Sequence, residues 1–246
     1  MNTIIKPSTR IVGQEEYYFS VKRKQIDEMN QTGVPVINLG IGSPDQAPSA
    51  EAIEELYQQS KDPSSHGYQP YQGIPQLRKA FADWYSKYYG VTLDPAKQIL
   101  PLFGSKEGLM HIAMSFLSPG DAALVPDPGY PAYGAVTRLA GAQVINFSLL
   151  PEHQWLPDLR ALEQMDLKKV KVMWVNYPNM PTGRRATKEL YTELVDFAGR
   201  HGILLVNDNP YSFILNNEPL SLLSVPGAIG TAMELNSLSK SHNMAG

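Results

Sequence analysis

Apolar positions along the chain alternate between short continuous runs and helical spacing. Short apolar runs bounded by turn residues predict buried strands, at 99–103, 122–125, 143–149, 171–175, 203–207 and 231–235. Apolar residues three and four positions apart predict amphipathic helices between these runs, at 105–117, 130–140 and 187–200. Strands that alternate with helices in this way form a largely parallel sheet covered on both faces. The pattern therefore predicts an α/β fold.

The part of the chain before residue 99 is predicted to contain helices without strands. Residues 1–11 are expected to form an extended arm. Helices are expected at 14–31, at 49–59, and over the amphipathic segment that starts near Leu77 and ends at Gly90. We divide the chain into an N-terminal arm and helix at 1–45 and a larger domain at 46–246. The sequence contains no internal repeat and no low-complexity tract.

Composition argues against several classes of function. A net charge of −3 and a pI near 6.0 provide no basic surface for nucleic acid. The absence of cysteine excludes disulfides, thiolate metal sites and a cysteine nucleophile. No apolar run approaches the roughly 20 residues of a membrane span, and the first residues lack the apolar core of a secretory signal. We therefore expect a cytoplasmic protein that binds neither nucleic acid nor a membrane, and no metal site.

In a parallel α/β sheet, ligands bind beyond the carboxyl ends of the strands, so the loops there carry the candidate chemistry. After 99–103 comes Gly104-Ser105-Lys106, which opens a helix whose free backbone N–H groups and dipole suit a phosphate. The alternative is that Ser105 is only the helix N-cap. After the next strand, prolines flank Tyr130, whose ring either lies against a planar ligand or only packs at the start of the helix.

The loops after the later strands carry further polar side chains. Asn179 is either a neutral hydrogen-bond partner for a ligand or part of a turn. Asp208 follows a buried strand, so its carboxylate must be paired. It either caps a local turn or faces a cationic ring nitrogen, with Tyr211 donating to a nearby oxygen. Lys240 is either a surface lysine or an amine that captures a carbonyl group.

In their order and spacing, these motifs resemble those of the class I and II aminotransferases, enzymes of fold type I that use pyridoxal 5'-phosphate (PLP). The matching motifs are Gly104-Ser-Lys, Pro128-Gly-Tyr-Pro, Asn179-Met-Pro-Thr-Gly, Asp208-x-x-Tyr211, Ser237-x-x-Lys240 and, upstream, Leu39-Gly-Ile-Gly-Ser-Pro-Asp and Tyr68-x-x-x-x-Gly73-x-x-x-Leu77-Arg78. Within the family, the chain looks most like the branch with diaminopimelate-, aspartate- and alanine-type enzymes. The resemblance implies a mostly parallel mixed sheet, PLP as cofactor, amino acid and 2-oxo acid substrates, and a homodimer.

The resemblance also implies a role for each motif residue. Lys240 forms a Schiff base with PLP and, once displaced by substrate, carries the proton between the substrate carbon and the cofactor. Asp208 keeps the pyridine nitrogen protonated, and Tyr211 hydrogen-bonds the phenolic oxygen. Tyr130 is implied to stack on the cofactor ring, and Ser105, Lys106 and Ser237 to bind its phosphate, with further cofactor contacts from Gly104 and Ser239. Tyr68 is implied to reach the phosphate bound by the partner subunit, and the backbone of Gly40 to meet the substrate carboxylate.

The chain departs from the family pattern in two places. Met180 stands where the family usually has the asparagine that touches the phenolic oxygen. We expect Asn179 to take its place; the alternative is that this hydrogen bond is missing. The chain also stops at Gly246, before the family's phosphate-binding arginine, its C-terminal small domain with the substrate-carboxylate arginine, and a further strand beside 99–103. We therefore expect a piece of a longer enzyme.

Other functions stay open from the residues alone. The same cofactor-binding motifs occur in carbon–sulfur lyases and in aminocyclopropane carboxylate synthase-like enzymes. A lyase releases ammonia and pyruvate, which distinguishes it from a transaminase. A PLP-binding transcriptional regulator would need a basic DNA-binding domain upstream, for which the segment before the first motif is expected to be too short. A generic doubly wound domain would need all the loop motifs to coincide by chance. For this chain alone, cofactor binding without turnover is a further possibility.

The 246-residue chain is expected to show negligible transamination even with PLP supplied, because the implied carboxylate-binding arginine is missing. The measurement is keto-acid formation by a preparation whose intact mass has been verified. Ordinary turnover by such a preparation would contradict the expectation that the chain is a piece of a longer enzyme.

Overall fold

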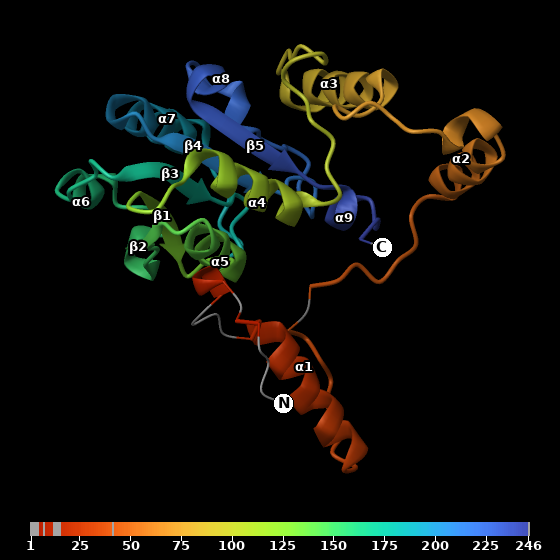
Figure 1. The fold of residues 1–246 in the computed structure, drawn as a ribbon, viewed down its shortest axis with the longest axis horizontal. Helices are drawn as coiled ribbons and strands as arrows, with labels where there is room; N and C mark the ends of the chain where they lie inside the picture. The colour runs from red at the N-terminus through yellow and green to blue at the C-terminus, as the bar shows by residue number, and fades with distance from the viewer. Residues whose placement is uncertain (1–4, 7, 12–15, 41, 246) are drawn as a thin grey trace.

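A computed structural model of the chain describes residues 5–6, 8–11, 16–40 and 42–245 (Figure 1). Its described residues form a 5-stranded, fully parallel sheet in the order β2-β1-β3-β4-β5. The strands are β1 (Ala122–Asp127), β2 (Gln143–Ser148), β3 (Val170–Val175), β4 (Leu204–Asn209) and β5 (Ala232–Asn236). The predicted α/β fold is confirmed.

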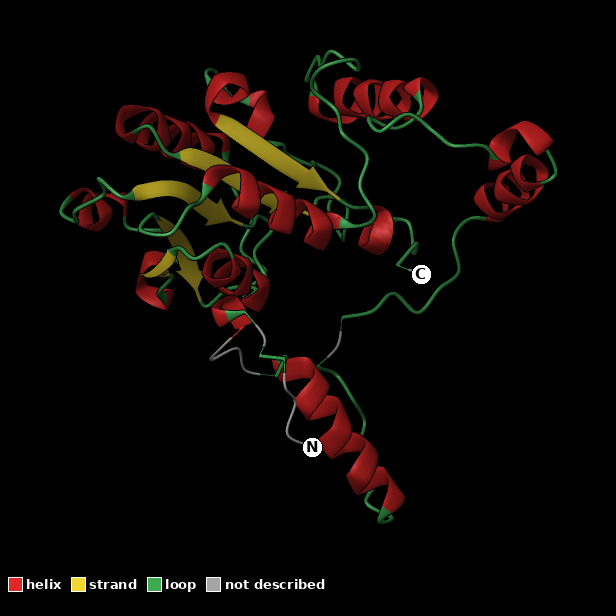
Figure 2. Cartoon of the chain, viewed as in Figure 1, coloured by secondary structure: helices red, strands yellow, loops and turns green. Residues whose placement is uncertain are grey.

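Helices connect the strands and cover both faces of the sheet (Figure 2). The longer helices are α1 (Tyr18–Gln31), α2 (Ala50–Ser60), α3 (Pro75–Tyr89), α4 (Ser105–Phe116), α5 (Pro131–Leu139) and α7 (Lys188–His201). The short ones are α6 (Leu159–Glu163), α8 (Ala228–Thr231), α9 (Leu238–Ser241) and the 3₁₀ turns Thr9–Ile11, Pro63–His66, Pro151–His153 and η4 (Leu222–Ser224). Local sequence sets their limits: the Thr187 hydroxyl caps α7, and Gly202, at φ 64°, ends it.

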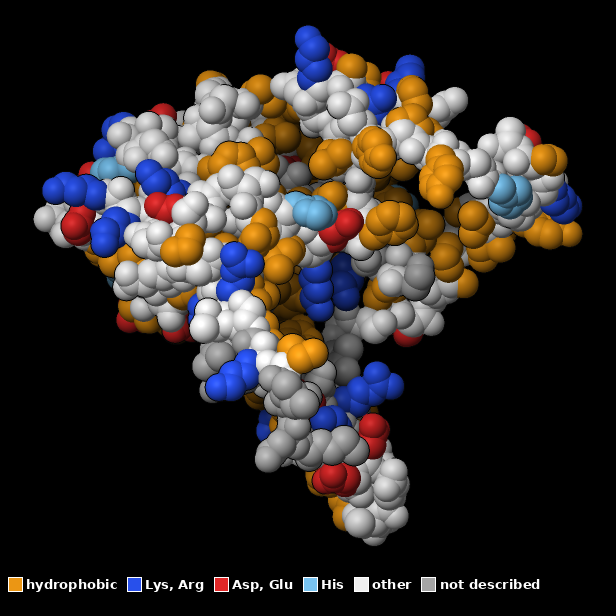
Figure 3. Space-filling model, in the orientation of Figure 1, with side chains coloured by type: hydrophobic (Ala, Val, Ile, Leu, Met, Phe, Trp, Pro, Cys, Tyr) orange, Lys and Arg blue, Asp and Glu red, His pale blue; other side chains and the backbone are white. Residues whose placement is uncertain are grey.

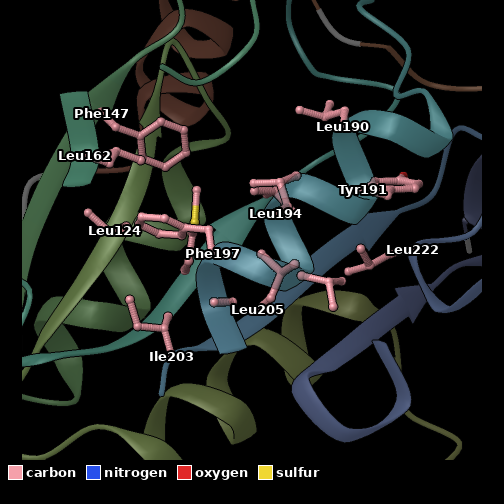
Figure 4. Close-up of a cluster of buried hydrophobic side chains, with 14 of the residues drawn as sticks. Leu124, Phe147, Leu162, Leu190, Tyr191, Leu194, Phe197, Ile203, Leu205 and Leu222 are labelled. Carbon is pink, nitrogen blue, oxygen red and sulfur yellow. The ribbon is translucent and has the colours of Figure 1, made fainter. Parts of the chain in front are cut away.

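The core consists of two apolar layers, one on each face of the sheet. Successive side chains of a strand point to opposite faces, so Trp174 of β3 joins the layer under α4 and α5, whereas Met173 joins the layer under α7. In Figure 4, Leu194 and Phe197 of α7 point into this second layer. Burial on both faces explains why β1 and β3 are nearly continuous apolar runs, whereas the outer strand β2 exposes Gln143, Asn146 and Ser148.

The expected strand at 99–103 is wrong, because this segment is irregular in the structure. Phe103 is fully exposed, although Leu102 packs against the layer under α4. A strand is stable only when a neighbour satisfies its backbone N–H and C=O groups. None of the described strands pairs with 99–103, and β5 is the outer strand on its side of the sheet. Ile99, Pro101 and Leu102 are partly buried, and Leu100 and Phe103 are exposed. The apolar run therefore overstated burial and predicted a pairing partner that the described residues do not contain.

The N-terminal helices stand away from the sheet. In Figure 1, α1 and α2 project from the body, and neither contains a buried residue. The helix expected at 14–31 begins at Tyr18, while residues 14–15 lie outside the described residues. Residues 1–4 and 7 of the expected arm also lie outside them, and Thr9–Ile11 form a 3₁₀ turn where an extended arm was expected. No helix in the described part of the chain is long and apolar enough to span a bilayer. The division at residue 45 stays a prediction.

Gly129→Ala is expected to destabilise the loop that precedes α5. A Cβ at Gly129 would lie 2.4 Å from the backbone carbonyl oxygen of Pro126, and a backbone atom cannot move aside as cheaply as a side chain. We expect a loss of about 2 kcal/mol or more in the free energy of unfolding, measured in urea.

The matched control is Gly199→Ala in α7. There the nearest atom to the new Cβ would be 3.9 Å away, so alanine is expected to raise stability by up to about 1 kcal/mol. Equal stability of the Gly129 variant and the parent chain would contradict the close approach in this loop.

Candidate active site

The candidate site lies at the carboxyl ends of the parallel strands, where the segments after β1, β3, β4 and β5 carry Tyr130, Asn179, Tyr211 and Lys240. Its centre is Asp208, which the structure places within β4 rather than just after it. The strand is longer than the predicted 203–207 because its ladder with β5 continues to Asn209 and Asn236. Asp208 is thereby held on regular backbone instead of on a loop.

The Asp208 carboxylate is buried, with 5% of the residue exposed, and is only half satisfied. The Tyr133 hydroxyl donates to Oδ2 at 3.0 Å, whereas the buried Oδ1 has no hydrogen-bond partner among the described residues. The interpretation that Asp208 caps a local turn is therefore wrong. Burial raises the pKa of Asp208 from 3.8 to about 6, and the Tyr133 hydrogen bond opposes that shift.

Two predicted tyrosines lie close enough to Asp208 to sense its charge. Burial raises the pKa of Tyr130 and the pKa of Tyr211, and the Asp208 carboxylate raises both further. Tyr130 is the N-cap residue of α5, and its ring meets the Tyr133 ring edge-on with centroids 5.7 Å apart. Asp208, Tyr130 and Tyr211 are thus electrostatically coupled, and their roles at a cofactor stay predictions.

The predicted phosphate loop leaves the N-terminus of α4 without a side-chain cap. Gly104 is the N-cap residue, at φ 93°, and Ser105 is the first residue of the helix. The alternative that Ser105 is the N-cap is therefore wrong. Lys106 extends toward two aromatic rings, with its Nζ 4.9 Å from the Tyr17 centroid and 5.7 Å from that of Tyr130. Uncapped N–H groups at a helix start favour an anion.

Lys240 lies on α9, directly after β5. Ser237 caps this short helix by accepting a hydrogen bond from the Ser239 N–H at 3.2 Å. The Lys240 Nζ donates to the Gly42 carbonyl oxygen at 2.6 Å. Gly40, the predicted substrate contact, lies two residues before Gly42, so this bond brings its loop to the lysine. Within the loop, the Gly40 N–H donates to Asn38 Oδ1.

Asn179 is buried and has an unused donor. Its Oδ1 accepts from the Thr182 backbone N–H at 3.3 Å and the Thr182 hydroxyl at 2.8 Å. Its Nδ2 is buried and has no partner in the part of the chain that the structure describes. The neighbouring Met180 N–H donates to Asn176. That Asn179 takes the place of the family asparagine stays a prediction. This role requires a free amide donor, which Nδ2 supplies.

Tyr68 is not brought to the other predicted residues. Its side chain is fully exposed, in the loop between α2 and α3. The expectation that it reaches a partner subunit stays a prediction.

The structure adds residues that sequence reasoning missed. Tyr133 follows Tyr130 by three positions, but Tyr130 is the extended N-cap residue and only Tyr133 lies within α5, so the spacing gave no distinct signal. Asn176 donates from Nδ2 to the Asp208 carbonyl oxygen at 2.6 Å. The Tyr17 hydroxyl lies 3.5 Å from that of Tyr130, and burial raises the pKa of Tyr17 to about 12.

These groups define what the site can accept. It offers a buried carboxylate oxygen without a donor, a buried amide N–H without an acceptor, and an uncapped helix start. Each group would be satisfied by a different ligand group: a cationic N–H donor at Asp208, an acceptor oxygen at Asn179 and an anion at the start of α4.

Asp208→Asn is expected to stabilise the ligand-free chain at neutral pH. Since burial raises the folded-state pKa of Asp208 to about 6, the folded chain binds this proton more tightly than the unfolded chain. Stability therefore falls as pH rises from about 4 to about 6. The amide oxygen of the variant still accepts from Tyr133, so the gain at neutral pH is expected to be on the order of 3 kcal/mol.

The measurement is urea unfolding across this pH range, with Asp83→Asn as control, because Asp83 is an exposed carboxylate of α3 paired with Lys79. A neutral-pH loss of stability in Asp208→Asn would contradict the raised pKa.

Comparison with known proteins supports the family that the motifs resemble. The model of the family "Aminotransferase class I and II" matches residues 34–246. The LL-diaminopimelate aminotransferase of Dehalococcoides mccartyi (strain CBDB1) is 44% identical over 244 residues, covering 98% of this chain and 63% of that protein. The enzyme of the same name from Aquifex aeolicus (strain VF5) is 39% identical over 241 residues, covering 97% and 62%.

Solved structures share the fold. Substrate-bound BacF from Bacillus subtilis is 37% identical with a TM-score of 0.91, covering 99% of this chain and 62% of that one. Thermus thermophilus aspartate aminotransferase with maleate is 27% identical with a TM-score of 0.89, covering 98% and 63%. The chain thus spans less than two thirds of the length of these proteins. Since the family model matches most of the chain, the chain belongs to the class I and II aminotransferase family.

Proposed function

We propose that this chain is the cofactor-binding part of a PLP-dependent aminotransferase that moves an amino group between an amino acid and a 2-oxo acid. The observation that carries the proposal is the half-satisfied carboxylate of Asp208. A buried acceptor without a donor is costly, and the protonated ring nitrogen of PLP is a cationic donor that would remove this cost. Family membership and the surrounding tyrosines support the same conclusion.

The residues present fit the cofactor. Asp208 Oδ1 would accept from the ring nitrogen, Tyr130 would lie against the ring, and Tyr211 and the free Nδ2 of Asn179 would donate to the phenolic oxygen. The uncapped start of α4 at Ser105 would meet the phosphate. The other proposed cofactor contacts are Gly104, Lys106, Ser237, Ser239 and, across a dimer, Tyr68. When bound, PLP supplies an electron sink for bond breaking at the amino-acid α-carbon.

Lys240 is the proposed proton carrier. Its ε-amino group is a basic nitrogen on a four-carbon stem that can reach a reacting atom and change direction there. The nitrogen now donates to the carbonyl of Gly42, so the loop with Gly40 lies within reach of the same group. We propose that this loop holds the substrate carboxylate while Lys240 moves the proton at the substrate α-carbon.

The charge of Asp208 is central to this role. In the ligand-free chain its raised pKa favours the neutral acid near and below pH 6. A cationic ring N–H beside Oδ1 favours the carboxylate, since an opposite charge at hydrogen-bond distance lowers a carboxyl pKa. We therefore propose that the Asp208 carboxylate is ionised when the cofactor is present and that it keeps the ring nitrogen protonated.

The proposed partner is a second copy of this chain. Apolar side chains gather over α2 and the loop before α3 (Figure 3), and the most exposed large ones are Leu56, Tyr57, Tyr68 and Tyr71. Contiguous exposed apolar surface of this kind marks an interaction site. The relatives named LL-diaminopimelate aminotransferase make LL-diaminopimelate the first amino donor to test. The cytoplasmic location stays a prediction.

Lys240→Ala is expected to abolish the visible absorption band that PLP acquires on binding covalently to a protein amine, because alanine leaves no ε-amino group there. Absorption spectra are recorded after PLP is added and the free cofactor is removed. Turnover by the proposed aminotransferase is expected to fall by orders of magnitude.

Lys168→Ala is the matched control, since Lys168 is an exposed lysine between α6 and β3, and it should keep the band. An unchanged band in Lys240→Ala would overturn the assignment of the lysine.

A further inference from the structure

We propose that Tyr133 is a positioning residue that determines which oxygen of Asp208 meets the cofactor; this rests on the proposed function for the identity of the ligand. The Tyr133 hydroxyl donates to Oδ2 at 3.0 Å. The other oxygen, Oδ1, is buried and has no partner among the described residues. One oxygen is thus used by the protein, and the other is left for the ring N–H.

Tyr133 has the rigidity that this role requires. The side chain is fully buried, and its ring is stacked on Trp174 with centroids 5.8 Å apart and planes 9° from parallel. The Thr137 hydroxyl donates to the Tyr133 carbonyl oxygen at 2.8 Å and accepts from the Trp174 ring N–H at 3.3 Å. Residues of α5 and β3 therefore fix both the backbone and the ring of Tyr133, so its hydroxyl has one direction.

The hydroxyl also affects the charge of Asp208. Burial raises the pKa of Asp208, and the hydrogen bond from Tyr133 lowers it. The titratable groups that face the carboxylate are Tyr133 of α5, Tyr130 at the start of that helix, and Tyr211 after β4. Each of these tyrosines has a raised pKa, so each is a neutral hydroxyl near pH 7. Tyr133 is the one whose hydroxyl hydrogen-bonds the carboxylate.

The site therefore separates two tasks that one carboxylate must perform. Oδ2 is held by a neutral donor that fixes the plane of the carboxylate and favours its charged form. Oδ1 keeps its full acceptor capacity in a buried position, where a charged donor binds most strongly. Without Tyr133, both oxygens would lack a partner, the carboxylate could rotate, and the neutral acid would be favoured to a higher pH.

The first experiment uses the ligand-free chain and the Tyr133→Phe variant, which removes only the hydroxyl. A hydrogen bond to a charged carboxylate is stronger than one to a neutral acid. The variant is therefore expected to lower the folding equilibrium constant about tenfold more at about pH 7.5 than at about pH 4.5. Urea unfolding at both pH values gives this ratio.

Tyr177→Phe is the matched control. Tyr177 is a buried tyrosine whose raised pKa is due to burial and is opposed by Arg184, with no carboxylate contributing. Its effect on stability should not change with pH. A Tyr133→Phe effect as independent of pH as this control would overturn the proposal.

A double variant keeps the test decisive if Tyr133→Phe does not fold at neutral pH. Asp208→Asn with Tyr133→Phe carries no charge at this position, so it is expected to fold and to show no pH dependence from residue 208. At neutral pH, the factor by which Tyr133→Phe lowers the folding equilibrium constant should be about tenfold smaller in the Asp208→Asn background than in the parent chain. Equal costs in both backgrounds would overturn the proposal.

The second experiment adds PLP. Tyr133→Phe is expected to bind PLP about tenfold more weakly than the parent chain. The pH range over which the visible absorption of the bound form changes should also be higher in the variant. Parent-like affinity and an unshifted pH profile would overturn the positioning role. Failure of the parent chain to bind PLP at all would instead overturn the proposed function, and the ligand-free experiments would still test the bond between Tyr133 and Asp208.

Discussion

The buried carboxylate of Asp208 imposes the constraint on which the candidate site depends. Desolvation raises its pKa to about 6, and the described residues supply a hydrogen-bond donor to only one of its oxygens. Such a group costs free energy in the ligand-free chain. The cost is tolerated because β4 and its neighbours are tightly packed and hold the residue in place, and it becomes useful when a cationic ligand pairs with the free oxygen.

The fold provides the surroundings that this carboxylate requires. Two apolar layers bury the sheet on both faces. A residue near the end of an interior strand such as β4 therefore lies in a low-dielectric setting, while the loops beyond it stay accessible. Parallel strands end at the same edge of the sheet, so the Tyr130 loop after β1 and α9 with Lys240 after β5 both lie along that edge. The two apolar layers stabilise the fold, and the polar side chains of the candidate site lie at the edge of the sheet where these layers end.

Periodicity predicted the β1 to β5 strands and the helices between them because burial on both faces leaves a direct signal in the sequence. It was wrong at 99–103, since an apolar run reports burial but not whether a neighbouring strand is present to pair with. The loop motifs singled out Asp208, Tyr130 and Tyr211, whose roles stay predictions. Tyr133 was missed because a buried tyrosine on a helix has the same sequence pattern as a core residue. Tyr17 was missed because its contact with Tyr130 joins positions 113 residues apart.

The most direct test is a titration of the Asp208 carboxyl carbon by NMR in the ligand-free chain, with Asp208→Asn used to assign the resonance. The buried, half-satisfied carboxylate predicts a pKa of about 6, and a marked fall in that pKa when PLP is added, because a cationic ring N–H favours the charged form. A pKa near the ordinary aspartate value of 3.8 in the ligand-free chain, unchanged by PLP, would contradict the account.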